Sequence, residues 1–129
     1  MRAIDTNIVV RFLVRDDEAQ AERARAIIAA GDVFLPTTVI LETEWVIRRS
    51  YGFSPIGAAA ALRKISGLPG VTLEAPAMVA EALVGMQAGM DFADALHLAA
   101  SRNCTAFLSF DRKLAKAAAQ HPGPPIEEP

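Results

Sequence analysis

Short apolar segments typical of strands alternate along this chain with longer segments typical of helices. Strands are predicted at residues 2–5, 33–35, 71–73 and 106–108. Each is followed by a segment with helical periodicity, capping residues or a high alanine content. Because parallel strands need a long crossover connection, repeated strand–helix units predict a mostly parallel sheet with helices on both faces. The expected fold class is therefore α/β, a three-layer α/β/α sandwich with a mostly parallel central sheet.

The predicted helices are bounded by residues that favour helix ends. Ser54 and Pro55 suit a cap and a first helical position, and Gly52 suits the end of the preceding helix. The two helices on either side of these residues are joined by only a few residues, which predicts a helical hairpin. The expected helices cover residues 8–14, 16–30, 37–50, 55–65, 76–87 and 91–103, with a last helix from Asp111.

Composition narrows the class of protein. With 129 residues and 52% hydrophobic residues, the chain is long enough for one core, and we expect a single domain over residues 1–129. The formal net charge of -2 supplies no basic field, so contact with nucleic acid would need local Arg and Lys clusters. The lone Cys104 cannot form an internal disulfide or a Cys-rich zinc site. No apolar run is long enough to span a membrane, and we expect a cytoplasmic protein.

Four acidic residues fall where predicted strands end or helices begin. They are Asp5, Glu42, Asp94 and Asp111. The carboxyl ends of parallel strands meet at one edge of a sheet, where ligands usually bind. Clustered carboxylates would repel one another without a divalent cation, and oxygen ligands select a hard cation such as Mg²⁺ or Mn²⁺. The pattern predicts metal-assisted chemistry on phosphodiesters.

The three aspartates among these acids also have a purely structural interpretation. Asp5 and Asp111 could simply cap helices, although Thr6 or Asn7 would also suit the cap of the first helix. Asp91 and Asp94 lie one turn apart, and either could be a helix-start acid favoured by the helix dipole. Only one of these two needs to bind a metal ion.

Two glutamates in the helix at residues 37–50 have different neighbours. Glu42 has mostly apolar neighbours at three and four residues, which predicts that it is buried and needs a partner such as a metal ion. Glu44 has Arg48 one turn later, which predicts a solvated ion pair.

Four segments together resemble a PIN-domain ribonuclease of the VapC toxin type. They are Ile4-Asp5-Thr6-Asn7, Leu41-Glu42-Thr43-Glu44-Trp45-Val46, Asp91-Phe92-Ala93-Asp94-Ala95-Leu96-His97-Leu98-Ala99 and Leu108-Ser109-Phe110-Asp111. The resemblance covers nearly the whole chain. It implies a metal-dependent endoribonuclease that uses Mg²⁺ or Mn²⁺, acts on RNA, forms a homodimer and is inhibited by a cognate VapB-like antitoxin.

The resemblance also assigns roles to residues. It implies metal ligands at Asp5, Glu42, Asp94 and Asp111, with further polar groups around them at Asn7 and Ser109. The family often has Thr where this chain has Ser109, a change that keeps the hydroxyl group. Asp91 lies beside the expected ligand, and the motif alone does not exclude it from the site.

Two other classes of function fit part of the pattern. A phosphoacceptor signalling domain also gathers acids at a strand end, but it usually has adjacent acids after the first strand, whereas Asp5 is followed by Thr6 and Asn7. An inactive PIN-like binding module would retain the fold without the chemistry. The chain contains neither a GxxxxGK[ST] loop nor a GxGxxG motif, so a nucleotide cofactor is not predicted. Because all four acids are present, the leading hypothesis is an active toxin nuclease.

Overall fold

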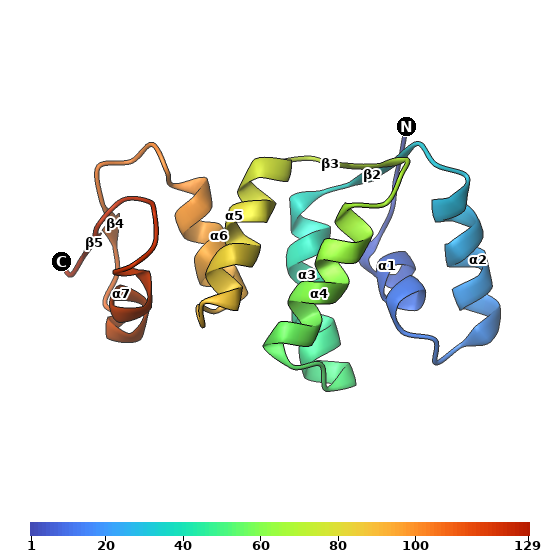
Figure 1. Ribbon diagram of the computed structural model, residues 1–129, viewed down its shortest axis with the longest axis horizontal. Coiled ribbons are helices and arrows are strands. Elements are labelled where there is room, and N and C mark those ends of the chain that lie inside the picture. The colour runs from blue at the N-terminus through green and yellow to red at the C-terminus, as the bar shows by residue number, and fades with distance from the viewer. The chain divides into compact units, whose positions relative to one another are not determined.

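The computed structural model describes residues 1–129, which fall into two units, Met1–Pro76 and Ala77–Pro129. The elements of the first unit are β1 (Arg2–Ala3), α1 (Thr6–Leu13), α2 (Glu18–Ala29), β2 (Val33–Leu35), α3 (Thr37–Tyr51), α4 (Pro55–Ser66) and β3 (Val71–Leu73) (Figure 1). The elements that follow are α5 (Pro76–Gln87), α6 (Phe92–Ala100), β4 (Phe107–Leu108), α7 (Arg112–Ala118) and β5 (Ile126–Glu127).

The first unit contains a three-stranded parallel sheet in the order β1-β2-β3. The central strand β2 pairs through Val33 with Arg2 on one side and with Val71 on the other, and Val33 is fully buried. Gly70 lies where β3 enters the sheet and has a φ of +80°, and a Cβ there would come within 2.7 Å of the Gly31 Cα. The sheet therefore needs glycine at this close approach. The predicted parallel pairing is confirmed.

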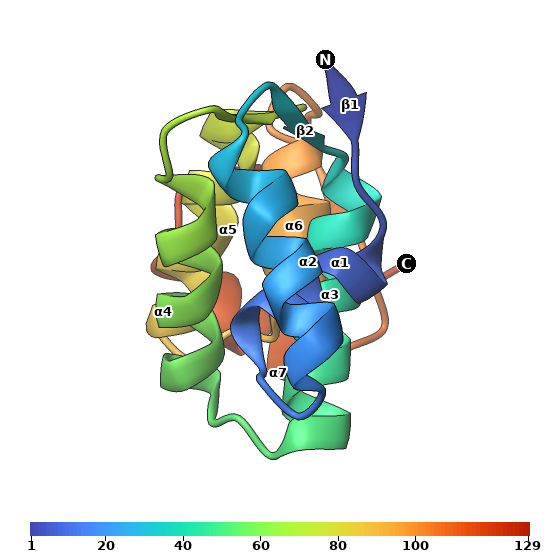
Figure 2. The same cartoon turned by 90° about the vertical axis from the view of Figure 1, so that its right-hand side faces the viewer.

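Helices α1 to α4 bury apolar side chains beneath these strands. α1 packs against α2 and α3, and α3 packs against α4. In both views the strands lie at one end of these four helices (Figure 2). Each of these four helices contributes buried apolar side chains on one face to the core. They include Val9, Val10, Ala24, Ile28, Ile40, Ile47, Leu62 and Ile65.

The predicted helical hairpin is confirmed. α3 ends at Gly52, whose φ of 68° places it in the left-handed region, and the Ser54 Oγ accepts a hydrogen bond of 3.0 Å from the Gly57 N–H. Pro55 occupies the first helical position of α4. The hairpin is thus built from local capping signals.

The start of the chain differs from the predicted one. The strand ends at Ala3 instead of residue 5, and α1 begins at Thr6. The cap of α1 is Asp5, which confirms the interpretation of Asp5 as a cap, and the alternative of Thr6 or Asn7 as the cap is wrong. Asp5 keeps an extended backbone as the cap, but only Arg2 and Ala3 are in register with β2, and the Ile4 N–H adds a 3.2 Å hydrogen bond to the Phe34 carbonyl.

The second unit contains the three helices α5, α6 and α7 and a second parallel pair of strands. Gly85 of α5 faces Ala95 of α6 so closely that a Cβ on the glycine would lie 3.0 Å from the Ala95 Cβ. β4 and β5 pair in parallel, with Phe107 opposite Ile126. The sequence did not predict β5, because it is two residues long and lies between Pro125 and Pro129.

α6 is shorter than predicted. It ends at Ala100 instead of residue 103, with Ser101 as its C-terminal cap. The Ser101 Oγ and backbone N–H both donate to the His97 carbonyl, at 2.8 and 3.1 Å. This serine thereby satisfies a carbonyl that the helix would otherwise leave free.

Candidate active site

Asp5 lies between β1 and α1 and has an exposed side chain. Its Oδ1 accepts a 2.8 Å hydrogen bond from the Thr6 N–H, and its carbonyl accepts from the Ile8 N–H at 3.1 Å. Asn7 follows on the first turn of α1 and is also exposed. The carboxylate is therefore fixed at the start of a helix while one face remains open to solvent.

Glu42 lies on α3 and is linked to the start of α1 through Thr6. Thr6 is buried, with 6% of its surface exposed, and its hydroxyl donates a hydrogen bond to the Glu42 Oε1. These two residues are 36 positions apart in the sequence. The structure thus brings the Asp5–Thr6 segment and Glu42 together within the first unit.

The buried acid of α3 is Glu44, and the prediction that Glu42 is the buried one is wrong. Glu44 is only 2% exposed and is paired with Arg48, whereas Glu42 is exposed. The buried face of α3 carries Ile40, Thr43, Glu44 and Ile47, spaced three, one and three residues apart. Glu42 falls outside this face, and its predicted role as a metal ligand does not need burial.

Three acids of the second unit lie at helix starts. Asp91 caps α6 and accepts a 3.3 Å hydrogen bond from the Asp94 N–H, which confirms Asp91 as a helix-start residue. Asp111 caps α7 by accepting from the Leu114 N–H at 3.1 Å. The Ser109 Oγ accepts from the Asp111 N–H at 3.0 Å and so fixes the turn that leads into α7.

These three acids share an open hollow of about 730 Å³ in the second unit. Burial and the charges of Asp91 and Asp111 raise the pKa of the Asp94 carboxyl, and His97 acts in the opposite direction. Lys113 and Lys116 line the same hollow. The arrangement combines mutually repelling carboxylates with positive side chains that could meet a phosphate group.

The sequence matches the family model of the PIN domain over residues 3–120. The chain belongs to the PIN domain family. PIN domains are α/β folds and are generally metal-dependent nucleases, so the match supports a nuclease activity. The predicted α/β class is confirmed, and the seven helices and parallel strands are consistent with the three-layer α/β/α description. No curated protein matches the sequence.

A metal site made of protein ligands alone is not present in either unit of this PIN domain. Neither unit contains three or more His, Cys, Asp or Glu side chains arranged to hold an ion. Mg²⁺ commonly binds to one or two carboxylates and completes its coordination with water and substrate phosphate. The oxygen donors of Asp94 and Asp111 suit that mode of binding. No helix of the PIN domain is both long and apolar enough to cross a membrane.

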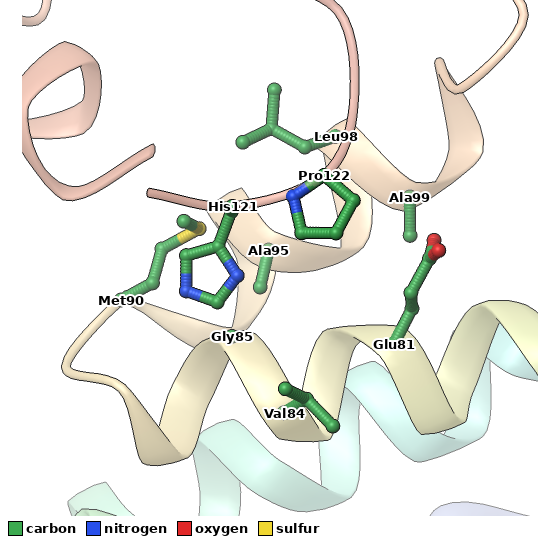
Figure 3. Close-up of a pocket in the computed structure, with 9 residues that line it drawn as sticks. All are labelled: Glu81, Val84, Gly85, Met90, Ala95, Leu98, Ala99, His121 and Pro122. Atoms are coloured by element: carbon green, nitrogen blue, oxygen red, sulfur yellow. The ribbon is translucent and has the colours of Figure 1, made fainter. Parts of the chain in front are cut away.

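A small apolar pocket of about 100 Å³ lies next to the hollow of the three acids and shares Met90 and His121 with it (Figure 3). Figure 3 shows Gly85 and Val84 on α5, Ala95 on α6, and His121 and Pro122 on the segment after α7. Glu81 also lines this pocket, but its carboxylate is paired with Arg102. The pocket is therefore lined by apolar side chains and contains no unpaired carboxylate.

The sequence did not predict the positions that two residues, Thr6 and Lys116, take near the acids. Thr6 lies three and four residues before Val9 and Val10, which are both buried, and this spacing was a signal that its hydroxyl would be buried and need a partner. Lys116 lines the hollow through its position on α7. No local signal in the sequence distinguished it from other exposed lysines.

Proposed function

We propose that this PIN domain is a Mg²⁺- or Mn²⁺-dependent endoribonuclease in which Asp5, Glu42, Asp94 and Asp111 are metal ligands. The observation that carries the proposal is the hollow that holds both Asp94 and Asp111 beside two lysines. Family membership supports the nuclease chemistry, and the continuous match over residues 3–120 supports one nuclease domain. A bound divalent cation would polarise the phosphoryl group and lower the pKa of an attacking water.

The residues around the proposed ligands hold them in place. The Thr6 hydroxyl orients the Glu42 carboxylate through its hydrogen bond. Ser109 fixes the turn that carries Asp111, and Asp91 fixes the first turn of α6 that carries Asp94. Outer groups of this kind orient metal ligands and limit their motion.

The lysines and the remaining polar groups suit an RNA substrate. Lys113 and Lys116 lie in the hollow, where they can offset the phosphate charge of RNA close to the carboxylates. Asn7 is an exposed amide on the first turn of α1, from which it can donate to the substrate.

We further propose that the nuclease is a toxin of the VapC type that forms a homodimer and is inhibited by a VapB-like antitoxin. The four segments that resemble this type support the proposal. An amphipathic antitoxin helix needs exposed apolar contacts, and the helical hairpin offers Trp45 and Ile56, which are 53% and 74% exposed. Ile40, Ile47 and Leu62 of the same hairpin are buried in the core and cannot serve as such contacts.

The proposed toxin role can be tested in cells. Expression of the chain should arrest growth, and sequencing of RNA 5′ ends should show new cleavage sites. Co-expression of the neighbouring-gene product should relieve the arrest, and an Asp94→Asn variant should produce neither effect. Normal growth with an unchanged set of RNA 5′ ends would contradict the toxin role.

A phosphodonor assay separates the alternatives. Incubation of the purified chain with a small phosphodonor should leave it unphosphorylated, whereas a phosphoacceptor domain would become labelled. Labelling at Asp5 without RNA cleavage would support the signalling alternative. The absence of both labelling and RNA cleavage would support an inactive binding module.

A further inference from the structure

A second hollow, of about 250 Å³, lies between α1 and α2 in the first unit. The two helices lie side by side in both views (Figures 1 and 2). α1 contributes Asn7, Ile8 and Arg11 to its wall, and α2 contributes Arg23 and Ile27. The wall thus combines two guanidinium groups with apolar side chains.

The two arginines of this hollow, Arg11 and Arg23, differ in their hydrogen bonds and ion pairs. The Arg11 guanidinium is already bonded, because its Nε donates to the Gln20 Oε1 at 2.6 Å and its Nη1 donates to Asp16 and Tyr51, each at 3.0 Å. The charge of Asp16 largely offsets that of Arg11. Arg23 is exposed and makes no hydrogen bond or ion pair with the rest of the chain. The hollow therefore keeps one uncompensated positive charge with free donors.

The position of the hollow connects it with the proposed cleavage chemistry. Asn7 lines the hollow and lies two residues after Asp5, the cap of α1. A strand that runs from Asp5 past Asn7 would meet this wall, which also carries the unpaired donors of Arg23.

We propose that this hollow is a binding site for a backbone phosphate of the RNA strand, next to the cleaved bond. The Arg23 guanidinium binds two phosphate oxygens through its planar fork of donors. Arg11, whose charge Asp16 largely offsets, is held in place by Gln20 and Tyr51 and forms part of the wall. Ile8 and Ile27 give an apolar wall for the adjoining ribose or base. The proposal rests on the RNA cleavage proposed above.

The test compares Arg23→Gln with Arg25→Gln. Arg25 lies on the same helix, is ion-paired with Glu22 and does not line the hollow. A short fluorescent single-stranded RNA of mixed sequence is titrated without divalent metal at several salt concentrations. Arg23→Gln should lower the slope of log K against log salt by about 0.7, the value for one lost phosphate contact on a single strand. Arg25→Gln should leave the slope unchanged.

Steady-state cleavage gives a second readout. Arg23→Gln should raise KM and leave kcat near the wild-type value, because the phosphate contact is made in both the bound substrate and the transition state. A wild-type slope and KM for Arg23→Gln would overturn the proposal while the nuclease function stands. An equal change in Arg25→Gln would also overturn it, since the effect would then be one of general charge.

Two further results overturn the proposal in distinguishable ways. If the wild-type chain neither binds nor cuts RNA, both the nuclease function and the phosphate site are wrong. If Arg23→Gln binds and cuts RNA normally but loses affinity for the neighbouring-gene product, the hollow binds a protein carboxylate instead of a phosphate.

Discussion

At the scale of single residues, the Thr6 hydroxyl is the contact that fixes Glu42. Thr6 is buried and donates to the Glu42 Oε1, whereas the rest of the Glu42 side chain is exposed and would otherwise be free to move. Thr6→Val keeps the shape of the side chain but removes the donor. We expect it to weaken Mn²⁺ binding and cleavage by about 10- to 100-fold, the usual effect of losing a group that orients a ligand.

The matched variant Thr6→Ser keeps the hydroxyl and should retain most of the wild-type Mn²⁺ affinity. Calorimetric titration with Mn²⁺ measures both variants in the absence of RNA, and thermal unfolding checks that both are folded. Equal Mn²⁺ affinity in Thr6→Val and the wild-type chain would show that Thr6 has only a structural role.

The Asp94 carboxyl should make stability depend on pH. Burial and the charges of Asp91 and Asp111 raise its pKa in the folded chain above the ordinary value of 3.8. The folded state therefore keeps this proton at pH values where the unfolded chain has lost it. The free energy of unfolding must therefore fall as the pH rises from the pKa of Asp94 in the unfolded chain through its raised pKa in the folded chain. Asp94→Asn should thus raise the melting temperature of metal-free protein at neutral pH.

Thermal unfolding in excess EDTA at a series of pH values measures this effect. The difference between Asp94→Asn and the wild-type chain should shrink as the pH falls below the unfolded pKa, because both side chains are then neutral. A difference that stays constant with pH would show that the substitution acts through packing instead of charge.

At the scale of elements, Glu44 and Arg48 form an ion pair within α3 whose carboxylate is buried. Glu44 is 2% exposed and the Arg48 side chain is 26% exposed. Arg48→Met would leave the buried carboxylate without this partner, and we expect a loss of about 3 kcal/mol in the free energy of unfolding. Arg25→Met breaks the exposed pair with Glu22 and should cost less than about 1 kcal/mol.

Urea unfolding of the two variants measures this contrast between a buried and an exposed ion pair. Glu44→Gln combined with Arg48→Met should recover part of the loss, since no buried charge is then left unpaired. Equal costs for Arg48→Met and Arg25→Met would mean that the Glu44 carboxylate is stabilised by other groups.

The helices show why some elements could be predicted and others could not. The hairpin of α3 and α4 follows from Gly52, Ser54 and Pro55, whose preferences act over a few residues. β5 has no such signal, because its two residues become a strand only by pairing with β4. Pairing between distant segments depends on tertiary structure, which local propensity does not encode.

The candidate site shows a similar division. Asp5, Asp91 and Asp111 were found at helix starts because capping has a local sequence pattern. The burial of Glu44 in place of Glu42 could not be predicted, since Thr43 and Glu44 are polar residues on the buried face of α3 and apolar periodicity does not mark them. The prediction therefore placed the buried face of α3 on the wrong side of the helix, because two of the residues on the true buried face are polar.

At the scale of the whole molecule, each unit carries two of the four proposed ligands. Met1–Pro76 contains Asp5 and Glu42, and Ala77–Pro129 contains Asp94 and Asp111. The PIN domain match extends through both units. If all four carboxylates serve one metal-dependent reaction, substitutions in either unit should abolish the same activity.

The most direct measurement of this central claim is the cleavage rate of one labelled single-stranded RNA by the purified 129-residue chain in Mg²⁺. The four variants are Asp5→Asn, Glu42→Gln, Asp94→Asn and Asp111→Asn. Asp91→Asn, at the acid next to Asp94 on the same helix, serves for comparison. Each of the four should lower the rate by more than about 100-fold, whereas Asp91→Asn should lower it less, and EDTA should abolish cleavage until Mg²⁺ is restored. Wild-type cleavage by any of the four variants in Mg²⁺, or by the wild-type chain in EDTA, would contradict the claim.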